Sequence, residues 1–211
     1  MSDIPFSAAC ERNKAVILST IKPVLESLDS VLEVGSGTAQ HAIHFALALP
    51  KLTWQTSEQD CYLDDVRVAL ESAKNSLASS DQDTALVNIQ PPVELNVSQT
   101  QWLESPQCFD AIYTANTLHI MSQTNVEEFF AGLAQVTATN SYLIVYGPFK
   151  YKGEFTSDSN RQFDETLRSR GVGSAIRDFE FVNQLAERQG FSLLNDHSMP
   201  ANNQCLIWKK T

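Results

Sequence analysis

Hydrophobic residues along the chain follow two spacings: short apolar runs typical of buried strands, and the three- and four-residue spacing typical of helices. Strands are predicted at Val31–Val34, Leu52–Ser57, Val93–Val97, Phe109–Ala115, Tyr142–Tyr146, Phe191–Leu194 and Gln204–Trp208. Helices are predicted at Ala8–Leu28 with a kink at Pro23, Ala39–Leu49, Asp60–Ala73, Val126–Leu133, Arg161–Arg170 and Asp178–Arg188. Strands that alternate with helices in this way predict an α/β fold with a mostly parallel sheet.

The end of the chain differs from this alternation. Residues 197–203 are too few for a helix, so the strands on either side of them should be antiparallel neighbours. We therefore expect a Rossmann-like, seven-stranded, mostly parallel sheet with a C-terminal antiparallel hairpin and helices on both faces. Residues 1–211 should form one domain, with an N-terminal helical segment at 1–28 and the core at 29–211. Residues 150–160 are predicted to be a long loop, a candidate lid.

The strand at Val31–Val34 leads directly into two glycines, Gly35 and Gly37, and then into a helix. Glycine permits positive φ and close backbone approach, and free N–H groups at a helix start can face a ligand. This arrangement predicts a nucleotide-type site. The six-position glycine fingerprint of NAD enzymes is incomplete, because its last position is Gln40.

Carboxylates and amides follow the neighbouring strands. Glu58 comes 23 residues after Gly35, near the spacing at which a carboxylate binds ribose hydroxyls. Its two oxygens can accept from both hydroxyls of a diol. Asp60 is interpreted as the cap of the next helix. Asn96, which closes the third strand, could contact an adenine amino group or neighbouring backbone.

Composition narrows the function classes. A net charge of −10 argues against tight binding to nucleic acid, and no apolar run reaches the ~18 residues needed to span a membrane. The N-terminus has no signal-peptide pattern and the four cysteines are scattered, so a reducing cytoplasm is expected. His41 and His44 have no third ligand nearby, so no metal site is predicted.

The segment Glu33–Thr38, with its acidic residue two places before the first glycine, resembles motif I of class I S-adenosylmethionine (SAM) methyltransferases. Over nearly the whole chain the sequence also resembles an uncharacterised methyltransferase-like family, domain of unknown function 938. The segments that carry this second resemblance are Glu11–Lys14, Leu32–Thr38, Tyr146–Phe149, Ser159–Asn160 with Phe163–Asp164, Gly173 with Ile176–Asp178, and Met199–Asn203.

The resemblance implies a SAM-dependent methyltransferase with SAM as its cofactor. The residues assigned to the cofactor are Arg12, Glu33, Gly35, Ser36, Gly37, Thr38, Glu58 and Asn96. On composition alone Arg12 is a surface residue. The family has no established substrate, so the resemblance supports fold and cofactor more than reaction.

Strand four ends without the Asn/Asp-Pro-Pro-aromatic tetrad of base methyltransferases, and Thr117–His119 resembles small-molecule enzymes instead. His119 and Asn116 are the candidate catalytic residues. His119 is a candidate general base, because an unperturbed histidine titrates near neutrality. A half-buried structural histidine is the alternative. Substrate contacts are predicted at Phe149, Asn160, Arg177 and Asn203, with Arg177 suited to an acidic molecule.

Two other functions stay open at this point. The chain could be a catalytically inactive SAM-binding or interaction module. It could also be an NAD(P)-dependent oxidoreductase, which the incomplete glycine fingerprint disfavours. The accepting atom and the oligomeric state do not follow from the sequence.

Overall fold

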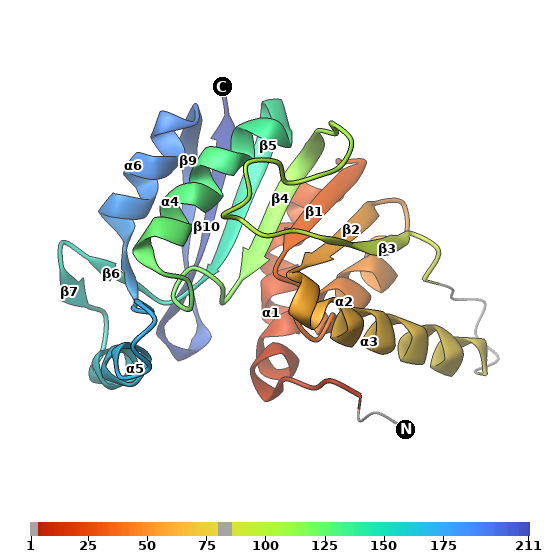
Figure 1. Ribbon diagram of the computed structural model, residues 1–211, viewed down its shortest axis with the longest axis horizontal. Coiled ribbons are helices and arrows are strands. Elements are labelled where there is room, and N and C mark those ends of the chain that lie inside the picture. The colour runs from red at the N-terminus through yellow and green to blue at the C-terminus, as the bar shows by residue number, and fades with distance from the viewer. Residues whose placement is uncertain (1–3, 80–85) are drawn as a thin grey trace. The chain divides into compact units, whose positions relative to one another are not determined.

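A computed structural model describes residues 4–79 and 86–211 (Figure 1). Its helices are α1 (Ala8–Leu25), α2 (Gln40–Ala48), α3 (Asp60–Ala78), α4 (Gln123–Gly132), α5 (Asp158–Arg168) and α6 (Phe179–Arg188). Its strands are β1 (Ser30–Val34), β2 (Thr53–Glu58), β3 (Ile89–Glu94), β4 (Phe109–Ala115), β5 (Thr137–Gly147), β6 (Phe149–Tyr151), β7 (Glu154–Phe155), β8 (Arg177–Asp178), β9 (Phe191–Met199) and β10 (Asn203–Lys210). No helix in the described part of the chain is long and apolar enough to cross a membrane.

Seven of the strands form one sheet in the order β3-β2-β1-β4-β5-β10-β9. β1 pairs in parallel with β2 and with β4, whereas β10 pairs antiparallel with both β5 and β9. The predicted α/β class, the seven strands and the C-terminal hairpin are confirmed. The reversed strand is β10, which lies inside the sheet, and β9 forms the edge.

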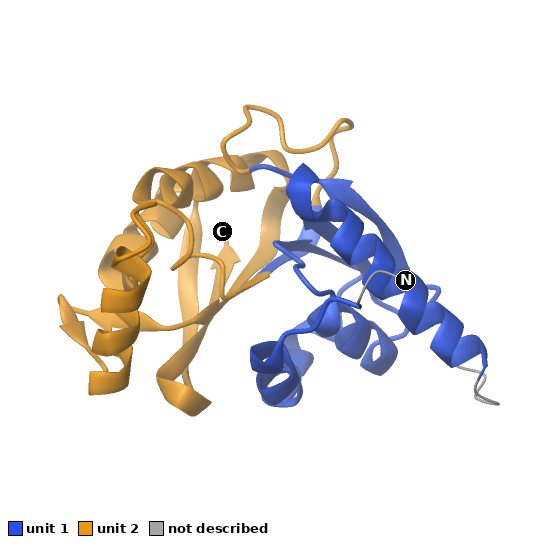
Figure 2. Cartoon of the chain, turned by 60° about the horizontal axis from the view of Figure 1, so that its bottom comes forward, with its two compact units in different colours: residues 1–96, 109–113 blue, residues 97–108, 114–211 orange. Residues whose placement is uncertain are grey.

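The chain divides into two compact units (Figure 2). Unit 1 comprises residues 1–96 and 109–113, and unit 2 comprises residues 97–108 and 114–211. In unit 1, α1 packs on α2, and α3 packs on β2 and β3. In unit 2, α4 packs on α6, which also packs on β9. The expectation of one domain over 1–211 stays a prediction.

Helix α1 begins where the sequence predicts, because the Ser7 hydroxyl accepts a hydrogen bond from Cys10 N at 3.3 Å. Its buried stripe is Asn13, Ile17, Ile21 and Leu25, at helical spacing. The helix ends at Leu25 and not at the predicted Leu28. Pro23 lies in its last turn, where the chain soon leaves helical geometry.

Several predicted segments are wrong in their boundaries or type. The third strand was expected at Val93–Val97 but is Ile89–Glu94, and it contains Pro91 and Pro92. β3 is an edge strand, where prolines can be tolerated because one side has no ladder to complete. The polar run Ser79–Asp83 also predicts a loop, and all of it except Ser79 lies outside the described residues.

The predicted long loop at 150–160 is instead ordered secondary structure. β6, β7 and β8 form a separate three-stranded sheet in the order β7-β6-β8, and α5 already begins at Asp158. β6 and β7 are joined by a two-residue turn at Lys152–Gly153, where both residues have positive φ. The candidate-lid interpretation of this segment is therefore not supported.

Trp102 packs in unit 2 against Gly132, in the last turn of α4. Its side chain is 2% exposed, and its ring lies 5.8 Å from that of Phe129, centroid to centroid. A Cβ built on Gly132 would lie 2.1 Å from Trp102 Cε2. The glycine therefore leaves the space that the indole ring fills, which assigns Trp102 to the core.

Replacing Gly132 with alanine should destabilise the protein by about 1–3 kcal/mol through overpacking. In an uncrowded helix the same change is ordinarily favourable by about 0.5–1 kcal/mol, so the sign is diagnostic. Urea unfolding measures the difference. In a Trp102→Leu background, Gly132→Ala should cost much less. A stabilising Gly132→Ala in the wild-type chain would contradict the packing.

Candidate functional site

The glycine loop of unit 1 leaves β1 and is fastened to β2. Gly35 and Gly37 have φ of 79° and 53°, which glycine adopts without strain. Gly35 N and Ser36 N both donate to Ser57 O, at 3.2 and 2.9 Å. A Cβ built on Gly37 would meet no atom within 4 Å. The first half of the loop is thus anchored, while the backbone at Gly37 borders open space.

Glu58 is the last residue of β2, and its carboxylate lies on the glycine loop. Oε2 accepts from Gly37 N at 2.9 Å, and Oε1 accepts from Gln59 N at 2.8 Å. The side chain is half-buried, and each carboxylate oxygen keeps a second lone pair. The structure therefore brings Glu58 to the loop, as its spacing in the sequence predicts.

Glu33 holds the loop from inside the fold. Its side chain is 2% exposed, and Oε2 accepts from Ser36 Oγ at 3.0 Å and from Trp54 Nε1 at 3.1 Å. Burial raises the pKa of Glu33 to about 7, against the opposing effect of these two hydrogen bonds. The charge of Glu58 raises it further. Direct contact of Glu33 or Ser36 with a cofactor stays a prediction.

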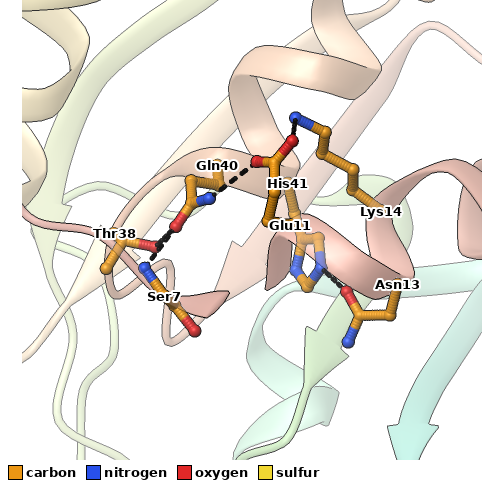
Figure 3. Close-up of polar contacts among 7 residues, drawn as sticks. All are labelled: Ser7, Glu11, Asn13, Lys14, Thr38, Gln40 and His41. Atoms are coloured by element: carbon orange, nitrogen blue, oxygen red, sulfur yellow. Dashed lines mark hydrogen bonds and ion pairs between the residues drawn. The ribbon is translucent and has the colours of Figure 1, made fainter. Parts of the chain in front are cut away.

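Gln40 connects the loop to the N-terminal segment (Figure 3). Its Oε1 accepts from Ser7 N at 2.6 Å and from Thr38 Oγ1 at 2.9 Å. Its Nε2 donates to Glu11 Oε2 at 3.0 Å, and Glu11 also pairs with Lys14 at 2.6 Å. The residue that breaks the NAD fingerprint therefore fastens the start of α1 to the glycine loop, a role that sequence reasoning missed.

His41, the second residue of α2, is a buried neutral side chain. Its Nε2 lies 2.7 Å from Asn13 Oδ1, as Figure 3 shows, and its Nδ1 lies 3.4 Å from the Tyr113 hydroxyl. Burial lowers the pKa of His41 to about 4. These contacts give His41 a structural role. Among residues 4–79 and 86–211, no group of three potential metal-ligating side chains occurs.

The two remaining cofactor candidates differ in their surroundings. Arg12 is exposed and lies nine residues before the buried Ile21, which is about two and a half turns away on the opposite face of α1. This orientation does not favour a cofactor contact. Asn96 lies two residues beyond β3, next to Leu95, whose N–H donates to Glu58 O at 2.9 Å. Asn96 therefore stays a candidate beside Glu58.

His119 lies in unit 2 after β4 and is 6% exposed. Its ring meets Phe163 of α5 edge-on, with centroids 5.4 Å apart. Burial lowers the pKa of His119 to about 4, and the charges of Arg177 and Arg170 contribute in the same direction. The side chain is therefore neutral at pH 7 and a weaker base than its ordinary pKa predicts.

Asn116 directly follows β4 and has left-handed backbone, with φ of 60°. Its backbone N–H donates to Tyr146 O at 2.8 Å, and the residue is half-buried. Left-handed backbone at a non-glycine residue costs free energy and is often found at functional positions. The geometry is consistent with the predicted role of Asn116, which stays a prediction.

Arg177 uses its guanidinium to hold backbone. Nε donates to Leu118 O at 3.1 Å, and Nη2 donates to Gly173 O at 2.9 Å and also to Met121 O. The Nε–Nη2 edge that would bind a carboxylate bidentately is therefore already occupied. Arg177 therefore has a structural role: it holds the backbone of the segment that carries His119. Its guanidinium no longer supports the expectation of an acidic substrate.

The other predicted substrate residues are also engaged within unit 2. Asn160 is 5% exposed, and its Nδ2 donates to Thr156 Oγ1 and Asn202 O, both at 2.9 Å. Asn203 Nδ2 donates to Pro200 O at 3.2 Å. Phe149 is 1% exposed and pairs with Arg177 between β6 and β8. Substrate contacts through these side chains stay a prediction.

Comparison with known proteins relates the chain to one family and one fold. The profile of a family described as "Protein of unknown function (DUF938)" matches residues 4–210. Among solved structures, the apo S-adenosylmethionine-dependent methyltransferase SibL is similar, with a TM-score of 0.75 and 16% identity over 96% of this chain and 56% of SibL.

Two further structures are similar to the same extent. Human N-acetylserotonin methyltransferase in complex with SAM gives a TM-score of 0.71 at 12% identity, over 96% of this chain and 52% of that protein. Mitomycin 7-O-methyltransferase MmcR gives a TM-score of 0.72 at 17% identity, over 93% of this chain and 55% of MmcR. This chain thus spans just over half the length of these proteins. At such identities the likeness shows the class I methyltransferase fold.

The pKa of Glu33 predicts how stability depends on pH. Between its ordinary pKa of 4.5 and about 7, the folded state binds more protons at Glu33 than the unfolded state does. The contribution of Glu33 to the free energy of unfolding should therefore fall as pH rises through this window, by about 3 kcal/mol in total. Glu33→Gln should remove that part of the slope in urea unfolding between pH 4.5 and 8.

Glu94→Gln, at an exposed carboxylate, should keep the slope of the wild-type chain. Identical slopes in the wild-type and Glu33→Gln chains would contradict the burial of Glu33 as the cause.

Proposed function

This chain belongs to the DUF938 family of proteins of unknown function, and we propose that it is a SAM-dependent methyltransferase acting on a small-molecule acceptor. The observation that carries the proposal is the carboxylate of Glu58 resting on Gly37 N at 2.9 Å. A carboxylate at that position can accept hydrogen bonds from the ribose hydroxyls of an adenosyl group beside the glycine loop. The class I methyltransferase fold of similar structures supports the same assignment.

The residues of the loop fit such a group. The open space beside Gly37 permits close approach to the backbone, and Glu58 supplies two acceptor oxygens. Asn96 would add an amide near the adenine. When bound, SAM supplies an electrophilic methyl group on a sulfonium, so the protein mainly has to position the acceptor and exclude water.

We propose that Asn116 and His119 of unit 2 bind the molecule that accepts the methyl group. A neutral His119 can accept a hydrogen bond from the acceptor and orient it for attack. The proton that the acceptor loses then passes to His119 or to solvent. Because Arg177 is engaged by backbone carbonyls, we propose a neutral acceptor in place of the acidic one that the sequence suggested. The charge of −10 disfavours nucleic acid as the acceptor.

A catalytically inactive SAM-binding module is a second candidate, and the low pKa of His119 favours it because the side chain is a weak base. Such a module would bind SAM and show no turnover with any acceptor. An NAD(P)-dependent oxidoreductase would instead bind NADH and change its fluorescence.

S-Adenosylhomocysteine (SAH) should bind the purified protein and raise its stability. A ligand at 100 times its dissociation constant adds about 2.7 kcal/mol to the free energy of unfolding. Calorimetry and a thermal shift measure both effects. Glu58→Ala should weaken binding by about 1–3 kcal/mol, the range for hydrogen bonds to a charged acceptor. No heat and no thermal shift at millimolar SAH would overturn the proposed function.

Gly37→Val should abolish SAH binding, because a branched side chain would occupy the open space beside the loop. Valine at positive φ also strains the fold, by about 1–3 kcal/mol. Gly171→Val is the matched control, since Gly171 has φ of 72° and likewise no atom within 4 Å of a built Cβ. If both variants bind SAH like the wild-type chain, the loop is not the binding site.

A further inference from the structure

Gln204 of β10 carries a buried amide oxygen that no group among the described residues satisfies. Its side chain is 9% exposed, and Oε1 has no hydrogen-bond partner in the described part of the chain. A buried acceptor without a partner has lost its hydrogen bonds to water and forms none in the protein, which costs free energy. Such an atom in a folded protein calls for an explanation, and a bound group is one of them.

The position of Gln204 in the sheet shows where this oxygen lies. Gln204 is the register partner of Gly147 on β5, and residues directly opposite each other in an antiparallel pair project from the same face. A Cβ built on Gly147 would meet only one atom within 4 Å, His119 Nδ1 at 3.6 Å. Gln204 and His119 therefore flank the space that the missing side chain of Gly147 leaves.

His119 brings the complementary chemistry to this space. Neither of its ring nitrogens makes a hydrogen bond within residues 4–79 and 86–211, whereas its backbone carbonyl is held by Ala175 N at 3.0 Å. A neutral imidazole has one N–H donor and one bare acceptor nitrogen. Nδ1 is the ring nitrogen that borders the space, and it donates or accepts according to the tautomer. The space therefore offers one acceptor, Gln204 Oε1, and one nitrogen that can take either role.

The charges around the space select its occupant. Arg177 and Arg170 both act on His119, and a positive field disfavours a cationic amine there. A carboxylate would face the unpartnered oxygen of Gln204, and the Nε–Nη2 edge of Arg177 is occupied by carbonyls. A neutral hydroxyl group fits, because it can donate to an acceptor and accept in return.

We propose that Gln204, Gly147 and His119 form a specificity subsite that binds a neutral hydroxyl group of the acceptor molecule. Gln204 Oε1 accepts a hydrogen bond from the ligand, Gly147 provides the room, and His119 orients the oxygen. The identity of this ligand as a methyl acceptor rests on the proposed function, whereas the subsite itself is built from unit 2 alone.

Phenol, anisole and benzoate are matched probes, binding to which is measured by ligand-observed NMR without SAM. Anisole lacks the donor, and benzoate carries a negative charge. Phenol should bind the wild-type chain at least about tenfold more tightly than either, the effect of one well-formed hydrogen bond. Gln204→Leu should reduce the affinity for phenol to that for anisole. Gly147→Ala should weaken the binding of phenol, because the added methyl group fills the space.

Stability measurements separate this subsite from an ordinary buried hydrogen bond. Gln204→Leu removes an unpartnered atom, so Tm should stay constant or rise. Thr56→Val is the matched control, because Thr56 Oγ1 is a buried unpartnered oxygen in unit 1 and its removal should not change phenol binding. Gly147→Ala should fold, since its contact with His119 would be at ordinary van der Waals distance.

Four results would overturn the subsite. The first three are equal binding of phenol and anisole, phenol binding that survives Gln204→Leu, and a lower Tm in Gln204→Leu. The fourth is a resident water at Gln204 with no binding of phenol. SAH calorimetry is independent of these measurements. Loss of SAH binding with intact phenol selectivity would reject the methyltransferase and leave the subsite standing, and the reverse result would reject the subsite alone.

Discussion

The buried carboxyl of Glu33 is the constraint on which the glycine loop depends. A carboxyl group in this position must be hydrogen-bonded or protonated, and here both conditions act together. Ser36 and Trp54 donate to the same oxygen, and Ser57 Oγ donates to the Glu33 backbone carbonyl at 2.6 Å. One side chain thus joins β1, the loop and β2, and the left-handed backbone of Gly35 and Gly37 is held where Glu58 can reach it.

The N-terminal helix is attached through the same loop, by a residue that replaces glycine. The amide oxygen of Gln40 accepts hydrogen bonds from Ser7 N and Thr38 Oγ1, and its amide nitrogen donates one to Glu11. A glycine here would allow closer helix–strand packing but could make none of these bonds. The departure from the dinucleotide fingerprint is therefore explained by tertiary structure: the chain uses this position to fix α1 beside its candidate cofactor loop.

Features set by local spacing could be predicted from the sequence, and features set by distant contacts could not. The limits of β4, the Ser7 cap and the approach of Glu58 to the loop follow from patterns within one or two elements. Arg177 satisfies carbonyls 56 and 59 residues away, which no local pattern encodes. The unpartnered oxygen of Gln204 is likewise visible only once β10 is paired with β5.

The electrostatics of unit 2 restrict the chemistry further. His119 is a weak base at neutral pH, because burial and the charges of Arg177 and Arg170 lower its pKa to about 4. The same positive charges favour negative charge that develops on a nearby oxygen. If the proposed methyl transfer takes place here, such a site would suit an acceptor hydroxyl that is itself acidic, such as a phenol, more than an aliphatic alcohol. Weak basicity at His119 is compatible with the proposed methyl transfer, because an acidic acceptor needs little help to lose its proton.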